Sequence, residues 1–188
     1  MLKVGDTLAR MLPKFRVWHM GIICDIHEYT PDGIYVMEFN DTDQINKITL
    51  RKFMFGRRYV WVLTYKRELD LFGPRVFRNR VERIQTAVNA FLKNNMRYHL
   101  YDYNCEYFVR MCVFNQEALW RSPQTTGVFS SSLFVSIALL GILATHVIDG
   151  AANVFDFERD SPDRRDDIRY RVEGDSIIQD PQKIADRG

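Results

Sequence analysis

Apolar residues in the N-terminal third of the chain fall into short runs separated by turn residues. Residues 17–24 (VWHMGIIC) are apolar on both faces, which is typical of a strand covered on both sides. The turn sequence at residues 30–33 (TPDG) follows, and then the β-rich run 34–39 (IYVMEF). The runs 45–50 and 59–65 indicate two more strands. Because no helical pattern intervenes, these strands predict antiparallel pairing.

The spacing of apolar residues becomes helical after Gly73. Apolar side chains then recur at steps of four and three, which predicts an amphipathic helix with Pro74 near its first turn. A second helix is expected to begin near Asn104, a favoured N-cap residue, with Cys105 and Cys112 on its apolar face. Strands followed by helices predict an α+β domain, an antiparallel sheet with packed helices. The buried stripe predicted for the first helix consists of Phe77, Val81, Ile84, Val88 and Phe91.

Two segments follow the predicted domain, which we place at residues 1–121. Residues 128–148 form 21 consecutive positions without Asp, Glu, Lys or Arg. At about 1.5 Å per residue, a helix of this length spans roughly the 30 Å core of a bilayer. We therefore expect a transmembrane or membrane-anchoring helix there, with a buried helix of the same domain as the alternative. Residues 149–188 are charged and poor in apolar residues, and we expect them to be largely disordered.

Charge is distributed unevenly along the chain. The whole chain has 26 Lys and Arg against 24 Asp and Glu, and this balance gives no argument for nucleic acid as a partner. Residues 149–188 hold 11 acidic and 7 basic residues, so an acidic tail follows a basic body, and the tail suits protein partners. The three cysteines cannot form a disulfide framework, which favours a reducing compartment.

Cys105 is the residue best placed to carry chemistry. A thiol at the first turn of a helix lies at the positive end of the helix dipole, which favours the thiolate. The free N–H groups of that turn also suit the oxyanion that forms when a thiolate attacks a carbonyl. Cys112 lies on the same face in the middle of the helix and is expected to be inert core. The sequence has no metal-ligand spacing and no Gly-rich phosphate loop, so we expect no cofactor and no metal.

A nucleophilic cysteine needs a base, and the chain has four histidines. His19 lies in the middle of an apolar strand, where its ring is either hydrogen-bonded or functional, and Gly21 leaves space beside it for another backbone or a substrate. His27 falls in a polar stretch next to a turn and is expected to be exposed. His99 precedes the Asn-Cys turn and serves only if its loop folds back, while His146 belongs to the hydrophobic segment. Separation along the chain does not decide among them.

Three blocks of the sequence occur in a familiar order: residues 4–8 (VGDTL), 18–22 (WHMGI) and 103–109 (YNCEYFV). They resemble the lecithin:retinol acyltransferase (LRAT) domain family, with its early Gly-Asp and His-x-Gly-Ile strands and its late Asn-Cys-Glu helix. The resemblance covers roughly residues 4–113. It implies a circularly permuted papain-like fold of the NlpC type, in which the His strand lies across from the N-terminus of the Cys helix. The same blocks occur in H-box/Asn-Cys proteins encoded by some picornaviruses.

The resemblance implies that Cys105 is the nucleophile and His19 the base. Family members take a fatty acyl group from a phospholipid ester onto sulfur and pass it to an alcohol, an amine or water. Many of them have a second His on the strand after the His strand, where residues 36–38 (VME) of this chain contain none. A carboxylate at Glu38 would hold the imidazole in an equivalent way, as the third member of a Cys-His-acid triad. Asn40, on the same strand face, is the substitute candidate, and a solvated Glu38 is the remaining alternative.

One further position departs from the family. Tyr107 replaces a His that is common in the family motif, at a place outside the catalytic pair. Together with the missing second His, this change bears on turnover more than on the fold.

We therefore expect a membrane-anchored thiol acyltransferase or phospholipase acting on glycerophospholipids, with the phospholipid membrane as partner and an unidentified acyl acceptor. Two alternatives stay open: a catalytically weak or inactive membrane-tethered interaction module, and a cysteine peptidase or amidase. The basic body predicts a catalytic domain that faces the cytosol at an intracellular membrane. The acidic tail lies across that membrane if residues 128–148 span it, and in the cytosol if they lie on it or fold back.

Overall fold

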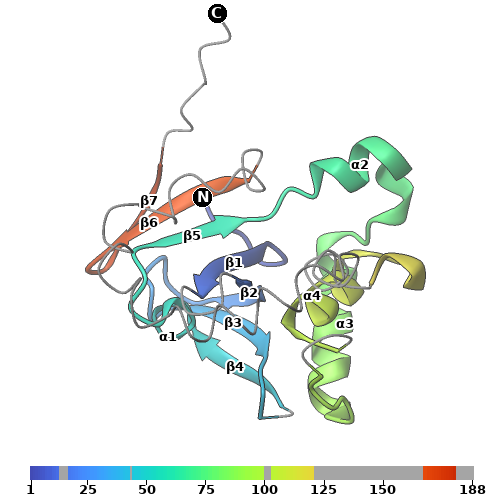
Figure 1. Cartoon of the computed structure of the whole chain (residues 1–188). Helices are drawn as coiled ribbons and strands as arrows, with labels where there is room; N and C mark the ends of the chain where they lie inside the picture. Colours follow the sequence, from blue (N-terminus) through green and yellow to red (C-terminus); the bar gives the residue numbers. More distant parts are fainter. Residues whose placement is uncertain (13–16, 43, 100–102, 121–166, 181–188) are drawn as a thin grey trace, which may run out of the picture.

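The computed structural model describes residues 1–12, 17–42, 44–99, 103–120 and 167–180 (Figure 1). The fold is α+β, as the sequence predicts: an antiparallel seven-stranded sheet in the order β4-β3-β2-β1-β5-β6-β7, with helices packed against it. The strands are β1 (Thr7–Leu12), β2 (Val17–Ile26), β3 (Ile34–Phe39), β4 (Ile45–Thr49), β5 (Tyr59–Val62), β6 (Ile168–Glu173) and β7 (Ser176–Gln179). The helices are α1 (Leu50–Met54), α2 (Lys66–Phe72), α3 (Arg80–Lys93) and α4 (Cys105–Val113), with 3₁₀ turns η1 (Pro74–Val76) and η2 (Glu117–Leu119).

Strand β2 is buried on both faces, as its apolar sequence predicts. On one face Met20 and Ile22 belong to the core that includes Phe108 of α4. On the other face Ile23 belongs to a second core that includes Phe53 of α1. Figure 1 accordingly shows α3 and α4 together on one side of the sheet, and α1 near β3 and β4. The sheet is thus the shared wall of two cores, and β2 lies inside it between β1 and β3.

Helix α4 begins where the sequence predicts. Asn104 is its N-cap, and the Asn104 side-chain oxygen accepts a hydrogen bond from the backbone N–H of Tyr107 at 3.0 Å. Phe108 and Cys112 are fully buried. The cap and the apolar face together fix both the start and the rotation of this helix, and so the position of Cys105.

Helix α3 begins later than predicted, so the expected start near Pro74 is wrong. Pro74 lies in the separate turn η1, and a capping box between Asn79 and Glu82 starts α3 at Arg80. The predicted stripe is also partly wrong, because Val81 is 66% exposed while Ala87 is fully buried. The first residue of the predicted stripe, Phe77, lies before the helix begins. A helical spacing counted from a residue outside the helix assigns some residues to the wrong helix face.

The expectation of a largely disordered tail is wrong for residues 167–180. Strand β6 pairs with β5, placing Tyr170 opposite Val60, and β7 pairs with β6. The two strands join through a two-residue turn in which Gly174 adopts a positive φ of 57°. Tyr170 is buried in the second core. The charged composition concealed a period-2 pattern, because the arginines of β6 point to the face of the sheet opposite Tyr170 and pair with acidic residues, as Arg169 does with Asp180 at 2.9 Å.

The predicted hydrophobic segment at residues 128–148 lies outside the described residues. None of the helices in the described ranges combines the length and the apolar character that a bilayer crossing requires. The membrane anchor therefore stays a prediction.

Candidate active site

His19 lies near the start of β2, where the strand begins to separate from β3. The β2–β3 ladder ends with Gly21 opposite Glu38, and on the other side of β2 His19 is paired with Arg10 of β1. Side chains of directly opposed residues share one face of a sheet, and diagonal neighbours lie within reach of long side chains. His19 and Glu38 are such neighbours, and Nε2 of His19 lies 2.7 Å from Oε2 of Glu38.

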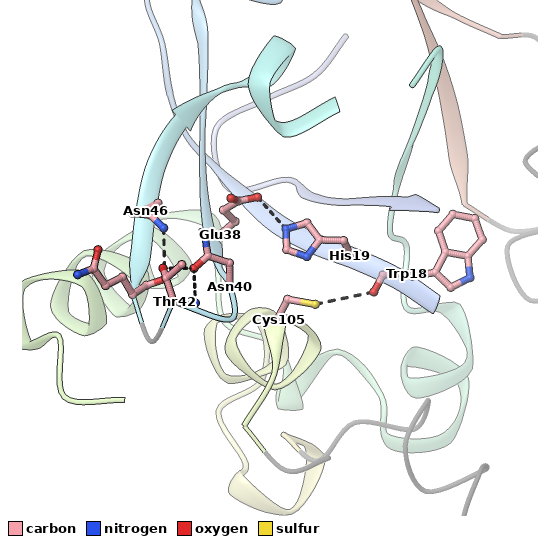
Figure 2. Close-up of polar contacts among 8 residues, drawn as sticks. Trp18, His19, Glu38, Asn40, Thr42, Asn46 and Cys105 are labelled. Carbon is pink, nitrogen blue, oxygen red and sulfur yellow. Dashed lines mark hydrogen bonds and ion pairs between the residues drawn. The ribbon is translucent and has the colours of Figure 1, made fainter. Parts of the chain in front are cut away.

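Helix α4 brings Cys105 close to His19 although the two residues lie far apart in the sequence. The Cys105 thiol donates to the backbone carbonyl of Trp18 at 3.8 Å, and Trp18 immediately precedes His19 on β2. Figure 2 shows the imidazole of His19 between the Glu38 carboxylate and the Cys105 side chain. Because Glu38 occupies Nε2, the Nδ1 atom is the ring nitrogen left for the thiol. The three residues singled out in the sequence are therefore neighbours in the structure.

The surroundings of His19 favour its protonated form. Burial lowers the pKa of His19, but its hydrogen bonds with Cys105 and Glu38 and their negative charges outweigh burial and raise the pKa from 6.5 to about 9. At neutral pH the ring is therefore an imidazolium that donates to Glu38. The protonated ring therefore lies between a carboxylate and the sulfur at the first position of α4 (Figure 2).

The site is nearly closed. Cys105, His19 and Glu38 are only 6%, 7% and 8% exposed. Exclusion of water strengthens the charge interactions among the three groups, and a substrate has to displace neighbouring side chains to reach the sulfur. A surface hollow of about 560 Å³ lies elsewhere, lined by residues of β5, β6 and the start of α3, and none of the three residues lines it.

The space predicted beside Gly21 is filled by protein. A Cβ atom at Gly21 would lie 2.6 Å from Cγ1 of Val36 and 3.0 Å from the ring of Phe53. The Phe53 ring also packs against His19, with 5.6 Å between ring centroids. Gly21 therefore permits close packing of α1 and β3 behind the imidazole and does not form a substrate channel.

The remaining candidates lie apart from this group. The Asn40 side chain accepts from the backbone N–H of Thr42 at 3.1 Å and so closes a turn, as Figure 2 shows. His27 is exposed, as predicted, and its ring contacts Asp25 at 2.7 Å. His99 is exposed as well, and its backbone pairs with Tyr103. Cys112 is fully buried, and burial raises the pKa of its thiol, as expected of inert core.

Tyr107 and His146 are the two remaining positions that the sequence singled out. The Tyr107 ring packs edge-on against Tyr103, with 4.8 Å between centroids, which fits a place outside the catalytic pair. His146 lies outside the described residues. Among the residues that are described, no three His, Cys, Asp or Glu side chains gather closely enough to hold a metal ion.

Sequence reasoning missed Arg10, whose side chain belongs to the same neighbourhood. Arg10 is 8% exposed, and its Nε and Nη1 atoms have no hydrogen-bond partner among the described residues. Its guanidinium carbon lies 5.6 Å from the ring centroids of Phe53 and of Phe55. The sequence did contain a signal, because Arg10 is the one charged residue in the otherwise apolar run from Leu8 to Leu12. A charged residue in a strand is usually interpreted as exposed to solvent, and so it attracts no attention.

Comparison of the chain with models of known protein families, with characterised proteins and with solved structures finds no match. The function is therefore inferred from the geometry of the site.

Proposed function

We propose that this protein is a thiol acyltransferase or phospholipase that takes a fatty acyl group from a glycerophospholipid through a thioester at Cys105. The proposal includes a circularly permuted papain-like arrangement of the NlpC type. Its main support is the position of His19: Nε2 lies 2.7 Å from Glu38, and Cys105 is close enough to help raise the pKa of the ring. The resemblance to the LRAT domain supplies the substrate class.

In the first half-reaction the Cys105 thiolate attacks the ester carbonyl carbon. A carbon–sulfur bond forms, and the carbonyl oxygen becomes an oxyanion that the N–H groups of the first turn of α4 can bind. The oxyanion then collapses, the ester carbon–oxygen bond breaks, and Nδ1 of His19 gives its proton to the departing lysophospholipid oxygen. The acyl group is left on sulfur.

In the second half-reaction an alcohol, an amine or water attacks the thioester. The nucleophile loses its proton to Nδ1 of His19, the carbon–sulfur bond breaks, and the thiolate is restored. Throughout, Glu38 accepts from Nε2–H, which fixes the tautomer and stabilises the imidazolium.

The direct test is trapping of the thioester. Wild-type protein incubated with phosphatidylcholine carrying a labelled acyl chain should acquire a label that hydroxylamine removes. Cys105→Ala should acquire none, while Cys24→Ala, which removes a thiol elsewhere on β2, should label as wild type does. An unlabelled wild type, or equal labelling of Cys105→Ala, contradicts the proposal.

A non-catalytic interaction module is the second candidate, and closure of the site favours it. Cys105 is 6% exposed, as is common for a packing residue. If the site never opens, iodoacetamide should alkylate Cys105 of the native protein no faster than it alkylates the fully buried Cys112. Selective alkylation of Cys105 argues for the enzyme, because only an accessible thiolate reacts quickly.

A further inference from the structure

Arg10 stands directly beside the catalytic histidine. Arg10 of β1 and His19 of β2 are paired in the ladder, so their side chains project from the same face of the sheet. The Phe53 ring contacts both, with 5.6 Å to the His19 ring centroid and 5.6 Å to the Arg10 guanidinium carbon. Burial lowers the pKa of Arg10, and the nearby charges of Glu38 and Cys105 oppose that lowering only in part.

The bonding of Arg10 is incomplete. A guanidinium is always charged and carries five N–H donors, and burying it without partners is costly. Two nitrogens of Arg10, Nε and Nη1, are buried and have no hydrogen-bond partner within the described part of the chain. The contacts with Phe53 and Phe55 offset part of the charge but accept no hydrogen bond in the plane of the guanidinium. Unpaired buried donors next to a reactive group require an explanation, and a bound ligand that accepts from them supplies one.

The chemistry of the donors specifies the ligand. A planar guanidinium matches the oxygens of a phosphate or a carboxylate better than any other protein cation does. In a glycerophospholipid the phosphodiester is separated from the acyl ester by only a few bonds. A lipid ester at Cys105 therefore brings its phosphate near the residue that is paired with His19.

Resting on the proposed function, we propose that Arg10 binds the phosphate of the acyl donor and so selects phospholipids over neutral acylglycerols. The bound anion supplies the acceptors that Nε and Nη1 lack. It also supplies specificity, because a neutral ester would leave the same donors buried and unpaired. The shared chemistry is an oxyanion, which comes either from a lipid phosphodiester or from free phosphate.

The kinetic test compares two substrates that differ only in the phosphocholine group. Short-chain dihexanoyl phosphatidylcholine and dihexanoylglycerol are hydrolysed by wild type, Arg10→Met, Arg10→Lys and Arg67→Met. The wild type should prefer the phospholipid, and Arg10→Met should lose about 10- to 100-fold of that preference in kcat/KM, with the loss appearing mainly in KM. Arg10→Lys should keep part of the preference for the phospholipid, because it keeps the positive charge but loses the planar, two-pronged set of N–H donors of the guanidinium. Arg67→Met, which removes an exposed arginine of α2, should behave as wild type.

An equal loss for both substrates overturns the proposal. It would mean that Arg10 only balances the charges of Glu38 and Cys105, since that role affects every ester alike.

A binding test separates this inference from the proposed function. Glycerophosphocholine and inorganic phosphate are titrated separately into wild type, Arg10→Met and Arg67→Met in a calorimeter. Glycerophosphocholine should bind wild type and Arg67→Met but not Arg10→Met. Binding of inorganic phosphate alone rejects the lipid source, and equal binding by Arg10→Met rejects the site. If glycerophosphocholine binding depends on Arg10 but the protein never forms a thioester, the anion site is supported. In that case only the proposed acyltransferase function is overturned.

Discussion

At the scale of single residues, the site depends on what touches the far nitrogen of His19. The sequence predicted Glu38 for this place from strand alternation together with the second His that the family resemblance implies on this strand, and the structure puts the Glu38 carboxylate 2.7 Å from Nε2. Asn40, the alternative on the same face, instead bonds to Thr42 in a turn. Alternation gives the face of a strand but not where two strands separate, and so it could not choose between the two residues.

Removing the charge of Glu38 should change the pH dependence of acyl transfer. Burial lowers the pKa of His19, and the contacts with Cys105 and Glu38 raise it to about 9, so wild-type activity should fall as pH rises through about 9, where the imidazolium is lost. In Glu38→Gln the carboxylate no longer raises the pKa, and the alkaline limb of kcat/KM should move to lower pH. The rate at neutral pH should fall by about 10²-fold. Asn40→Ala is the control. If the alkaline limb of kcat/KM moves in that variant, Asn40 and not Glu38 is the third member of the triad.

At the scale of secondary structure elements, the long and strongly patterned segments were predictable. The four strands read from the sequence correspond to β2, β3, β4 and β5, and the start of α4 at Asn104 is confirmed. Helices α1 and α2 were not predicted, because elements of 5 and 7 residues are too short to display a helical period. The missing α1 mattered most, since it carries Phe53, which packs against His19 and Arg10.

The N-cap of α4 should couple stability to reactivity. Asn104→Ala removes the acceptor for the Tyr107 N–H, and we expect a loss of about 1 kcal/mol in the free energy of unfolding by urea. The alkylation rate of Cys105 should also fall, because fraying of the first turn removes the N–H groups that stabilise its thiolate. Asn104→Asp keeps a capping oxygen and should restore stability. A lower alkylation rate without any loss of stability would show that Asn104 acts on the sulfur by another route.

At the scale of the whole molecule, the sheet joins segments that lie far apart in the sequence. The backbone N–H of Thr64, just after β5, donates to Asp167 at 2.7 Å, and Arg51 of α1 contacts Asp175 at 2.6 Å. The charged composition predicted disorder for this part of the tail. That prediction was incorrect because the pairing of β6 with β5 joins residues far apart in the sequence, and local composition contains no signal for such pairing. The tail is therefore part of the folded body from residue 167 to residue 180.

Buried and exposed positions of the added strands should differ sharply in their effect on stability. Tyr170→Ala removes a side chain from the core beneath β5 and should lower the free energy of unfolding by about 3 kcal/mol. Ile178→Ala on the edge strand β7, where the side chain is 40% exposed, should cost under about 1 kcal/mol. Urea unfolding of both variants measures the difference. Similar small losses in the two variants would mean that β6 contributes little to the fold in solution.

The pairing of β5 with β6 also constrains how the chain meets a membrane. Residue 120 follows α4, which packs on the sheet, and residue 167 precedes β6 of the same sheet, so both ends of the stretch 121–166 lie on one folded body. If both ends lie on the same side of a bilayer, the stretch fits a re-entrant or surface-lying anchor. A single membrane crossing would instead put the paired strands β5 and β6 on opposite sides of the bilayer. In protease protection on sealed vesicles, tags before Met1 and after Gly188 should be digested together, and survival of one tag alone would show that β5 and β6 part in the membrane.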